Sequence, residues 1–229
     1  MTHAADARTI AVLSSARQLV DFLLARADIL PALENRSVTS HIGAALADCT
    51  LQAGFSYDTV VSGRVRRIVE LFPEAATVSG TIDVLSAYGP RHFLSWTHPG
   101  KIVRFTGLLC HIHAESVESC ADLCSWLDRE EARQSLLSLT GIGPKTVDYL
   151  CGLVGLDCVA VDRHMRQLSR WVGIEQTDYA ELKLVISYAA DLMDVPRRQF
   201  DWWLWRVMAR KDKRQGEASL VGPCTASAF

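Results

Sequence analysis

Apolar residues recur along most of the chain at intervals of three and four positions, which is the spacing of one face of an α-helix. The first stripe consists of Val12, Ala16, Leu19 and Leu23, and it predicts an amphipathic helix that ends near Leu30. No segment alternates between apolar and polar residues at a period of two. The pattern therefore predicts an all-α fold.

Polar residues in front of the apolar stripes mark where further helices are expected to begin. These starts are predicted at Ser37, Ser56, Asp128 with Glu131 as a capping box, Thr177 and Asp194. The helix behind Ser37 runs into Gln52, where Gly54 breaks it. The stretch from Gln215 to Phe229 is rich in Gly, Ser and Ala without periodicity, and we expect a mobile tail there.

Two short apolar stripes flank the sequence Thr140-Gly141-Ile142-Gly143-Pro144. This arrangement predicts a helix, a hairpin and a second helix. The two glycines permit positive φ and a close backbone approach, and Pro144 suits the first turn of the second helix. The N–H groups at such a helix start suit a phosphate.

One lysine and one aspartate stand out around this hairpin. Lys145 lies in the first turn of the second helix, where the helix dipole and desolvation disfavour the charged amine. A neutral lysine is a nucleophile. Asp162 ends the apolar run from Cys158 to Val161 and is positioned to cap a helix that begins at Arg163. By spacing alone, Lys145 could be only a solvated lysine in a hairpin that binds DNA, and Asp162 could be an ordinary helix cap.

Composition limits the classes of protein that the chain can belong to. It has 229 residues, 49% of them hydrophobic, which is enough for a substantial core. The formal net charge is −2 and the sequence pI is about 6.4, so a nucleic-acid partner would have to meet local basic patches. No apolar run approaches the length of a membrane span. We expect a cytoplasmic, nucleoid-associated protein with reduced thiols.

Cysteines, histidines and basic residues offer weaker candidate sites. Cys110, His111 and His113 with Cys120 and Cys124 gather soft ligands, but a helical stripe explains both later cysteines, and we predict no metal there. Basic residues on the helix after Asp162 and at the C-terminal end could meet phosphates or face water: Arg163, Arg166, Arg170, Arg197, Arg198, Arg206, Arg210, Lys211, Lys213 and Arg214. Trp202 and Trp205 are interpreted as packing residues, with base stacking as the alternative.

The stretch from Leu136 to Met165 resembles the helix-hairpin-helix GPD superfamily of DNA glycosylases, and in particular its endonuclease III-like members. The shared features are the leucines, the hairpin glycines, Lys145-Thr146, and Val161-Asp162 followed by His164. The resemblance covers residues 35 to 211. It implies two helical lobes with a central helix-hairpin-helix and a catalytic cleft between the lobes.

The resemblance also implies roles for individual residues. Lys145 would be the Schiff-base nucleophile and Asp162 would assist it. Gln52, in Leu51-Gln52-Ala53, matches the glutamine that probes the gap in the DNA. The predicted DNA contacts are Gln52, Gly141, Ile142, Gly143, Thr146 and Arg163. The partner would be double-stranded DNA with a damaged base or an abasic site, bound by a monomer.

No redox cofactor or catalytic metal is expected, although hairpin carbonyls around Gly141 and Gly143 could hold a monovalent cation, as the resemblance suggests. Many endonuclease III relatives end in a four-cysteine iron–sulfur loop. This chain has only Cys224 after the last predicted helix, so we predict no iron–sulfur cluster. The predicted domains are an N-terminal helix (1–35) that packs with the C-terminal lobe, a helical lobe (36–135), the hairpin with the C-terminal lobe (136–211), and a tail (212–229).

Two alternatives to an endonuclease III-like enzyme stay open. His164-Met165 resembles 8-oxoguanine glycosylases, whereas Ala160-Val161-Asp162 is closer to endonuclease III and its oxidised-pyrimidine substrates. From another class, a non-catalytic DNA-binding module would use the hairpin only to grip the backbone. The leading prediction is a base-excision repair glycosylase with abasic-site lyase activity that removes a damaged base, with an oxidised base as the preferred substrate.

Overall fold

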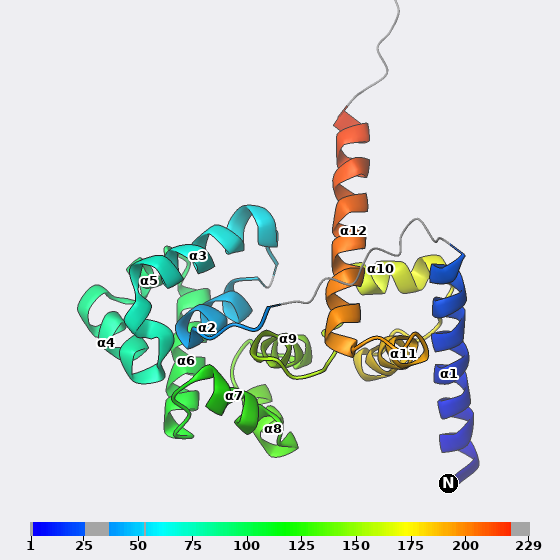
Figure 1. The fold of residues 1–229 in the computed structure, drawn as a ribbon, viewed down its shortest axis with the longest axis horizontal. Coiled ribbons are helices and arrows are strands. Elements are labelled where there is room, and N and C mark those ends of the chain that lie inside the picture. Colours follow the sequence, from blue (N-terminus) through cyan, green and yellow to red (C-terminus); the bar gives the residue numbers. More distant parts are fainter. Residues whose placement is uncertain (1, 26–36, 53, 221–229) are drawn as a thin grey trace, which may run out of the picture. The chain divides into compact units, whose positions relative to one another are not determined.

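The computed structural model describes residues 2–25, 37–52 and 54–220, and in this part of the chain it contains helices and no β-strand (Figure 1). The predicted all-α fold is confirmed. The α-helices are α1 (Thr2–Leu24), α2 (Ile42–Leu51), α3 (Ser62–Leu71), α4 (Val78–Tyr88), α5 (Pro90–Leu94), α6 (Pro99–Ala114), α7 (Cys120–Leu127), α8 (Glu130–Leu137), α9 (Pro144–Val154), α10 (Arg163–Val172), α11 (Tyr179–Leu192) and α12 (Arg197–Leu220). Two short segments differ from α-helix: the π-helical η2 (Tyr57–Val61) and the 3₁₀-helical η3 (Pro73–Ala76).

Internal contacts divide the chain into two compact units, residues 37–160 and residues 1–36 with 161–229. The hairpin between α8 and α9 thus groups with the helices before it, whereas the sequence placed a boundary at 135–136. The reason is that α9 packs on α2 and α7, both of which precede the hairpin.

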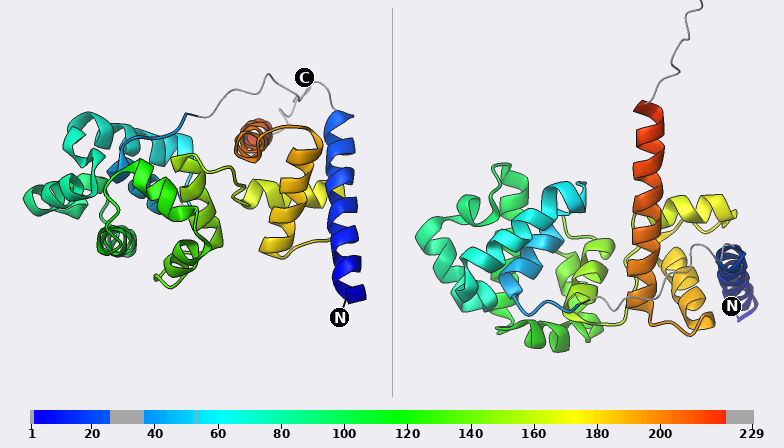
Figure 2. Two further views of the ribbon diagram at one scale, coloured as in Figure 1. Left: turned by 60° about the horizontal axis from the view of Figure 1, so that its bottom comes forward. Right: turned by 45° about the horizontal axis from the view of Figure 1, so that its top comes forward.

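Helix α2 forms the centre of the unit 37–160. All ten of its residues are buried, and α3, α4, α6 and α9 pack around it (Figure 2). Three alanines and one glycine are among the ten residues of this helix, and such small side chains let the neighbouring helices approach closely. The large buried side chains around it are Phe93, Phe105, Leu94, Leu108, Ile68 and Ile112. A helix enclosed in this way gives its C-terminal end, at Gln52, a fixed position.

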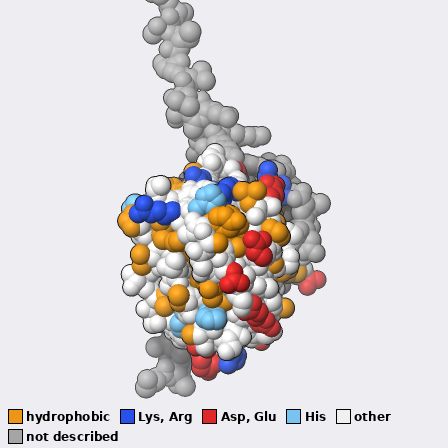
Figure 3. All heavy atoms as spheres, turned by 90° about the vertical axis from the view of Figure 1, so that its left-hand side faces the viewer, with side chains coloured by type: hydrophobic (Ala, Val, Ile, Leu, Met, Phe, Trp, Pro, Cys, Tyr) orange, Lys and Arg blue, Asp and Glu red, His pale blue; other side chains and the backbone are white. Residues whose placement is uncertain are grey.

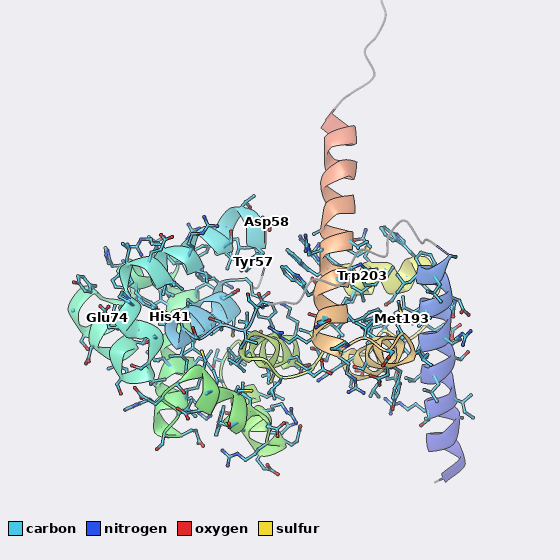
Figure 4. The ribbon with its side chains drawn as sticks, viewed as in Figure 1. His41, Tyr57, Asp58, Glu74, Met193 and Trp203 are labelled. Atoms are coloured by element: carbon cyan, nitrogen blue, oxygen red, sulfur yellow. The ribbon has the colours of Figure 1, made fainter. Side chains whose placement is uncertain are left out.

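His41, labelled in Figure 4, caps α2 in place of the predicted Ser37. Its Nδ1 accepts a hydrogen bond from the Ala44 N–H, and its Nε2 donates to the Phe72 carbonyl oxygen at 2.9 Å. Histidine is uncommon as a cap. Here the second hydrogen bond joins the start of α2 to the end of α3. This tertiary contact explains why a histidine occupies the cap position.

The predicted helix starts at Ser56 and Asp128 also differ from the structure. Ser56 precedes the π-helical segment and makes no side-chain cap. Asp128 has helical dihedral angles at the end of α7, so Arg129 becomes the N-cap of α8 and no capping box forms there. A capping box instead begins α7, where Ser119 and Asp122 bond to each other's backbone N–H groups.

The unit formed by residues 1–36 and 161–229 is built on α1 packed against α11. Arg8 forms an ion pair with Glu181 at 2.5 Å, and the Ser15 hydroxyl donates to Gln176 at 2.8 Å. Helix α1 ends at Leu24, and the predicted end near Leu30 lies outside the described residues. In the C-terminal part, α12 packs on α10 and α11, and its Trp203 (Figure 4) is buried.

Helix α12 continues to Leu220, through the first residues of the segment for which the sequence predicts a mobile tail. Residues 221–229 lie outside the described part of the chain. Within residues 2–25, 37–52 and 54–220, no helix is both long enough and apolar enough to cross a membrane.

Candidate functional site

The hairpin between α8 and α9 takes the form that its sequence predicts. Gly141 has φ +80°, and Gly143 has an extended backbone and is the N-cap of α9, which begins at Pro144. The Gly143 carbonyl oxygen accepts hydrogen bonds from the N–H groups of Thr146 and Val147. The side chains of Ile142 and Thr146, two of the predicted DNA contacts, are buried. A ligand at this hairpin would therefore meet backbone groups and the side chains of other elements.

Arg104 of α6 reaches the hairpin from outside it. A Cβ atom at Gly141 would collide with the Arg104 guanidinium group, so the two residues are in direct contact. The Arg104 Nε is buried and has no hydrogen-bond partner in the part of the chain that the structure describes. Gly141 is thus needed both for its positive φ and for the space that Arg104 occupies.

Replacing Gly141 by alanine is expected to lower the free energy of unfolding by about 2 kcal/mol, because φ is positive and the guanidinium must move. Gly143→Ala is the matched control, since a Cβ there meets nothing within 4 Å and φ is −115°. It should cost less than about 1 kcal/mol as an altered cap. Urea unfolding of both variants measures the difference, and equal losses would contradict this account of Gly141.

Lys145 is partly buried in the first turn of α9, and its amine contacts two side chains. Its Nζ donates a hydrogen bond to Gln52 Oε1 at 2.6 Å and lies 4.6 Å from the centre of the Tyr149 ring. The Tyr149 hydroxyl in turn donates to Asp48 Oδ1 of α2 at 3.1 Å. Gln52 is the C-cap of α2, and its Nε2 is buried without a hydrogen-bond partner among the described residues. The fold therefore brings together two of the residues singled out from the sequence, 93 positions apart.

Lys101 of α6 lies at the same end of α2. Its side chain is buried, and its Nζ donates to the carbonyl oxygens of Thr50 at 2.7 Å and Leu51 at 3.2 Å. Burial, followed by the positive charges of Arg104 and Lys145, lowers the pKa of Lys101 to about 8. Burial and the carboxylate of Asp48 raise the pKa of the nearby Cys49 to about 12.

Asp162 belongs to the other unit and caps α10, as predicted. Its Oδ1 accepts hydrogen bonds from the N–H groups of His164 at 2.9 Å and Met165 at 3.0 Å. Its Oδ2 accepts one from His164 Nδ1 at 2.8 Å. His164 is buried and meets Trp205 edge to face, with ring centres 6.4 Å apart. The carboxylate is held in one orientation by three hydrogen bonds.

The basic residues of this unit differ in their surroundings. Arg163 and Arg170 are exposed, but Arg166 donates to the Thr177 carbonyl oxygen and Arg197 pairs with Asp191. Arg198 is buried. Trp202 and Trp205 stack on each other with ring centres 5.2 Å apart, and Arg206 lies over Trp202. The side chains of Arg210, Lys211, Lys213 and Arg214 lie outside the described part. The predicted basic face of α10 is therefore reduced to Arg163 and Arg170.

Of the soft ligands around α6, His111 makes a structural contact. His111 Nε2 donates to the Ser135 hydroxyl oxygen at 2.9 Å, and the hydroxyl donates to the Ala132 carbonyl oxygen. Among the described residues, no three His, Cys, Asp or Glu side chains are arranged to hold a metal ion.

No family model matches this chain, and no curated protein matches it. The resemblance to DNA glycosylases accordingly depends on the motif residues themselves and stays a prediction.

Sequence reasoning missed Lys101, Arg104, Tyr149 and Asp48. Tyr149 follows Lys145 by four positions on one helix, which is a spacing that brings side chains together, so it could have been found. Lys101 and Arg104 reach the site from α6, and they lie 39 and 36 positions before Thr140, where the hairpin begins. No local pattern marks such a contact.

Proposed function

We propose that this protein is a DNA repair glycosylase with abasic-site lyase activity, with Lys145 as the nucleophile. The observation that carries the proposal is the 2.6 Å hydrogen bond between Lys145 Nζ and Gln52 Oε1. The family resemblance assigns these two residues to one reaction on DNA, and the fold places them in contact. Tyr149 and Asp48 support the same arrangement, because the ring and carboxylate hold the amine and the end of α2 in one geometry.

In the proposed reaction, the damaged nucleotide is rotated out of the duplex. The neutral Lys145 amine attacks C1′ of its sugar, a C–N bond to Nζ forms, and the bond to the base breaks with its electron pair leaving on the base. Opening of the sugar ring gives a protonated Schiff base between Nζ and C1′. This electron sink favours loss of a proton from C2′ and departure of the 3′ phosphate, which cuts the strand.

Asp162 is proposed to accept a proton from Lys145 or to stabilise the cationic sugar. Three hydrogen bonds orient the carboxylate, and His164 supplies one of them. Orientation of this kind suits a group that must act on one particular atom.

DNA would be held by local positive charge, since the formal net charge is −2. One face of the unit 37–160 carries basic side chains mainly along its upper edge in Figure 3 and acidic ones mainly towards the lower right. The charged groups that act on Cys49 are the cations Lys101, Arg104 and Lys145 and the carboxylate of Asp48. We propose that the hairpin backbone and the exposed Arg163 contact the phosphates of double-stranded DNA, bound by a monomer.

A panel of duplexes, each with one oxidised, deaminated or alkylated base or one abasic site, tests the function. Incubation in the presence of a metal chelator should give strand cleavage 3′ to the abasic site and to an oxidised base, with an unsaturated sugar left at the 3′ end. An 8-oxoguanine-type enzyme would select the oxidised purine over oxidised pyrimidines. Tight binding to every duplex without cleavage of any would favour the non-catalytic DNA-binding module.

A further inference from the structure

We infer that Lys101 is a positioning residue for Lys145: it holds the end of α2 that carries Gln52, and its positive charge faces the Lys145 amine. The inference goes beyond the proposed function, which gives Lys101 no role, and it rests on that function for its catalytic meaning. Two lysines from different helices, α6 and α9, contact three consecutive residues at the end of α2: Lys101 contacts Thr50 and Leu51, and Lys145 contacts the C-cap Gln52.

The contacts of Lys101 join the end of α2 to α6. The last carbonyl groups of a helix lack partners within the helix and carry its negative dipole end. The Lys101 amine donates to two of them, at Thr50 and Leu51, from a side chain that is only 8% exposed. Gln52 follows directly, so its amide oxygen stands where Lys145 can donate to it.

Lys101 and Lys145 act on each other as like charges. Arg104 of α6 and Cys49 of α2 also act on Lys101. Cys49 stays a neutral thiol, because its pKa is raised to about 12. Asp48 of α2, which accepts a hydrogen bond from Tyr149, adds one negative charge near Cys49. With a pKa of about 8, Lys101 is still mainly protonated at neutral pH. Like charges oppose each other's protonation, so Lys101 increases the fraction of Lys145 that is neutral.

Titration of the two amines by NMR tests the coupling without any assay of activity. The chain has five lysines, so a full-length protein labelled at the lysine Cε carbons gives few signals, and Lys101→Met and Lys145→Met assign two of them. In the wild type, Lys101 should titrate with a midpoint near 8. In Lys145→Met the midpoint of Lys101 should rise, and in Lys101→Met the midpoint of Lys145 should rise by the same amount, because coupling is reciprocal.

Three further variants separate charge from structure. Lys101→Arg keeps the charge and should leave the midpoint of Lys145 near its wild-type value. Lys101→Gln keeps a donor for the α2 carbonyls without the charge and should raise that midpoint as Lys101→Met does. Lys183→Met, a lysine of α11, should change neither midpoint.

An unchanged Lys145 midpoint in both Lys101→Met and Lys101→Gln would overturn the inference. If neither variant folds, the Lys145→Met variant supplies the test, because Lys145 is partly exposed and its replacement leaves the hydrogen bonds of Lys101 to Thr50 and Leu51 intact. An unchanged titration midpoint of Lys101 in Lys145→Met would then overturn the inference. Under single-turnover conditions, Lys101→Met should also shift the pH profile of strand cleavage to higher pH. Absence of cleavage in the wild type would refute the proposed function while the measured coupling stands, so the two failures are distinguishable.

Discussion

Strand cleavage at an abasic site is expected to fall by at least about a thousandfold when Lys145 is replaced by methionine, because the variant has no amine to form the Schiff base. Methionine keeps an unbranched stem of similar length, so packing against the Tyr149 ring is retained. Folding, followed by urea unfolding, should change little. Affinity for abasic-site DNA should fall by less than about tenfold, the loss expected for one cationic contact.

The matched control for this variant is Lys183→Met, which removes a lysine from α11 and should cleave at the wild-type rate. If Lys145→Met loses affinity in parallel with cleavage but cleaves normally at saturating protein, Lys145 is a phosphate contact. That result would favour the non-catalytic use of the hairpin.

Replacing Asp162 by asparagine is expected to lower turnover by roughly a hundredfold to ten-thousandfold while DNA binding is retained. Asparagine caps helices about as well as aspartate, so the N–H groups of His164 and Met165 keep an acceptor and α10 stays folded. The change removes the negative charge, and with it the ability to take a proton from the amine or to stabilise a cation.

Asp178→Asn is a close control for Asp162→Asn. Asp178 caps α11 in the same unit and accepts hydrogen bonds from the N–H groups of Ala180 and Glu181, which is the same capping geometry. Both variants should unfold at similar urea concentrations, but only Asp162→Asn should lose turnover. Wild-type turnover in Asp162→Asn would reduce Asp162 to a cap.

Local features of the fold were predictable because the interactions that determine them lie within a few residues. The all-α class follows from apolar spacing, the start of α9 from Pro144, and the cap of α10 from Asp162 directly before a helix. The positive φ of Gly141 was likewise expected from the glycine itself.

Other features depend on contacts between distant segments, and the sequence could not supply them. His41 caps α2 because it also bonds to Phe72, 31 positions away. Gln52 was singled out by resemblance, but its contact with Lys145 follows only from the packing of α9 on α2. Lys101 and Arg104 show no motif, since burial and a guanidinium against Gly141 become visible only in three dimensions.

The central claim is that Lys145 forms a covalent Schiff base with DNA, and reductive trapping tests it most directly. Sodium borohydride is added to the full chain and a duplex with one abasic site, and the cross-linked product is digested and mapped by mass spectrometry. The proposed function predicts one adduct, on Lys145, that is absent in Lys145→Met and present in Lys183→Met. No adduct at any pH, or an adduct that persists in Lys145→Met, would contradict it.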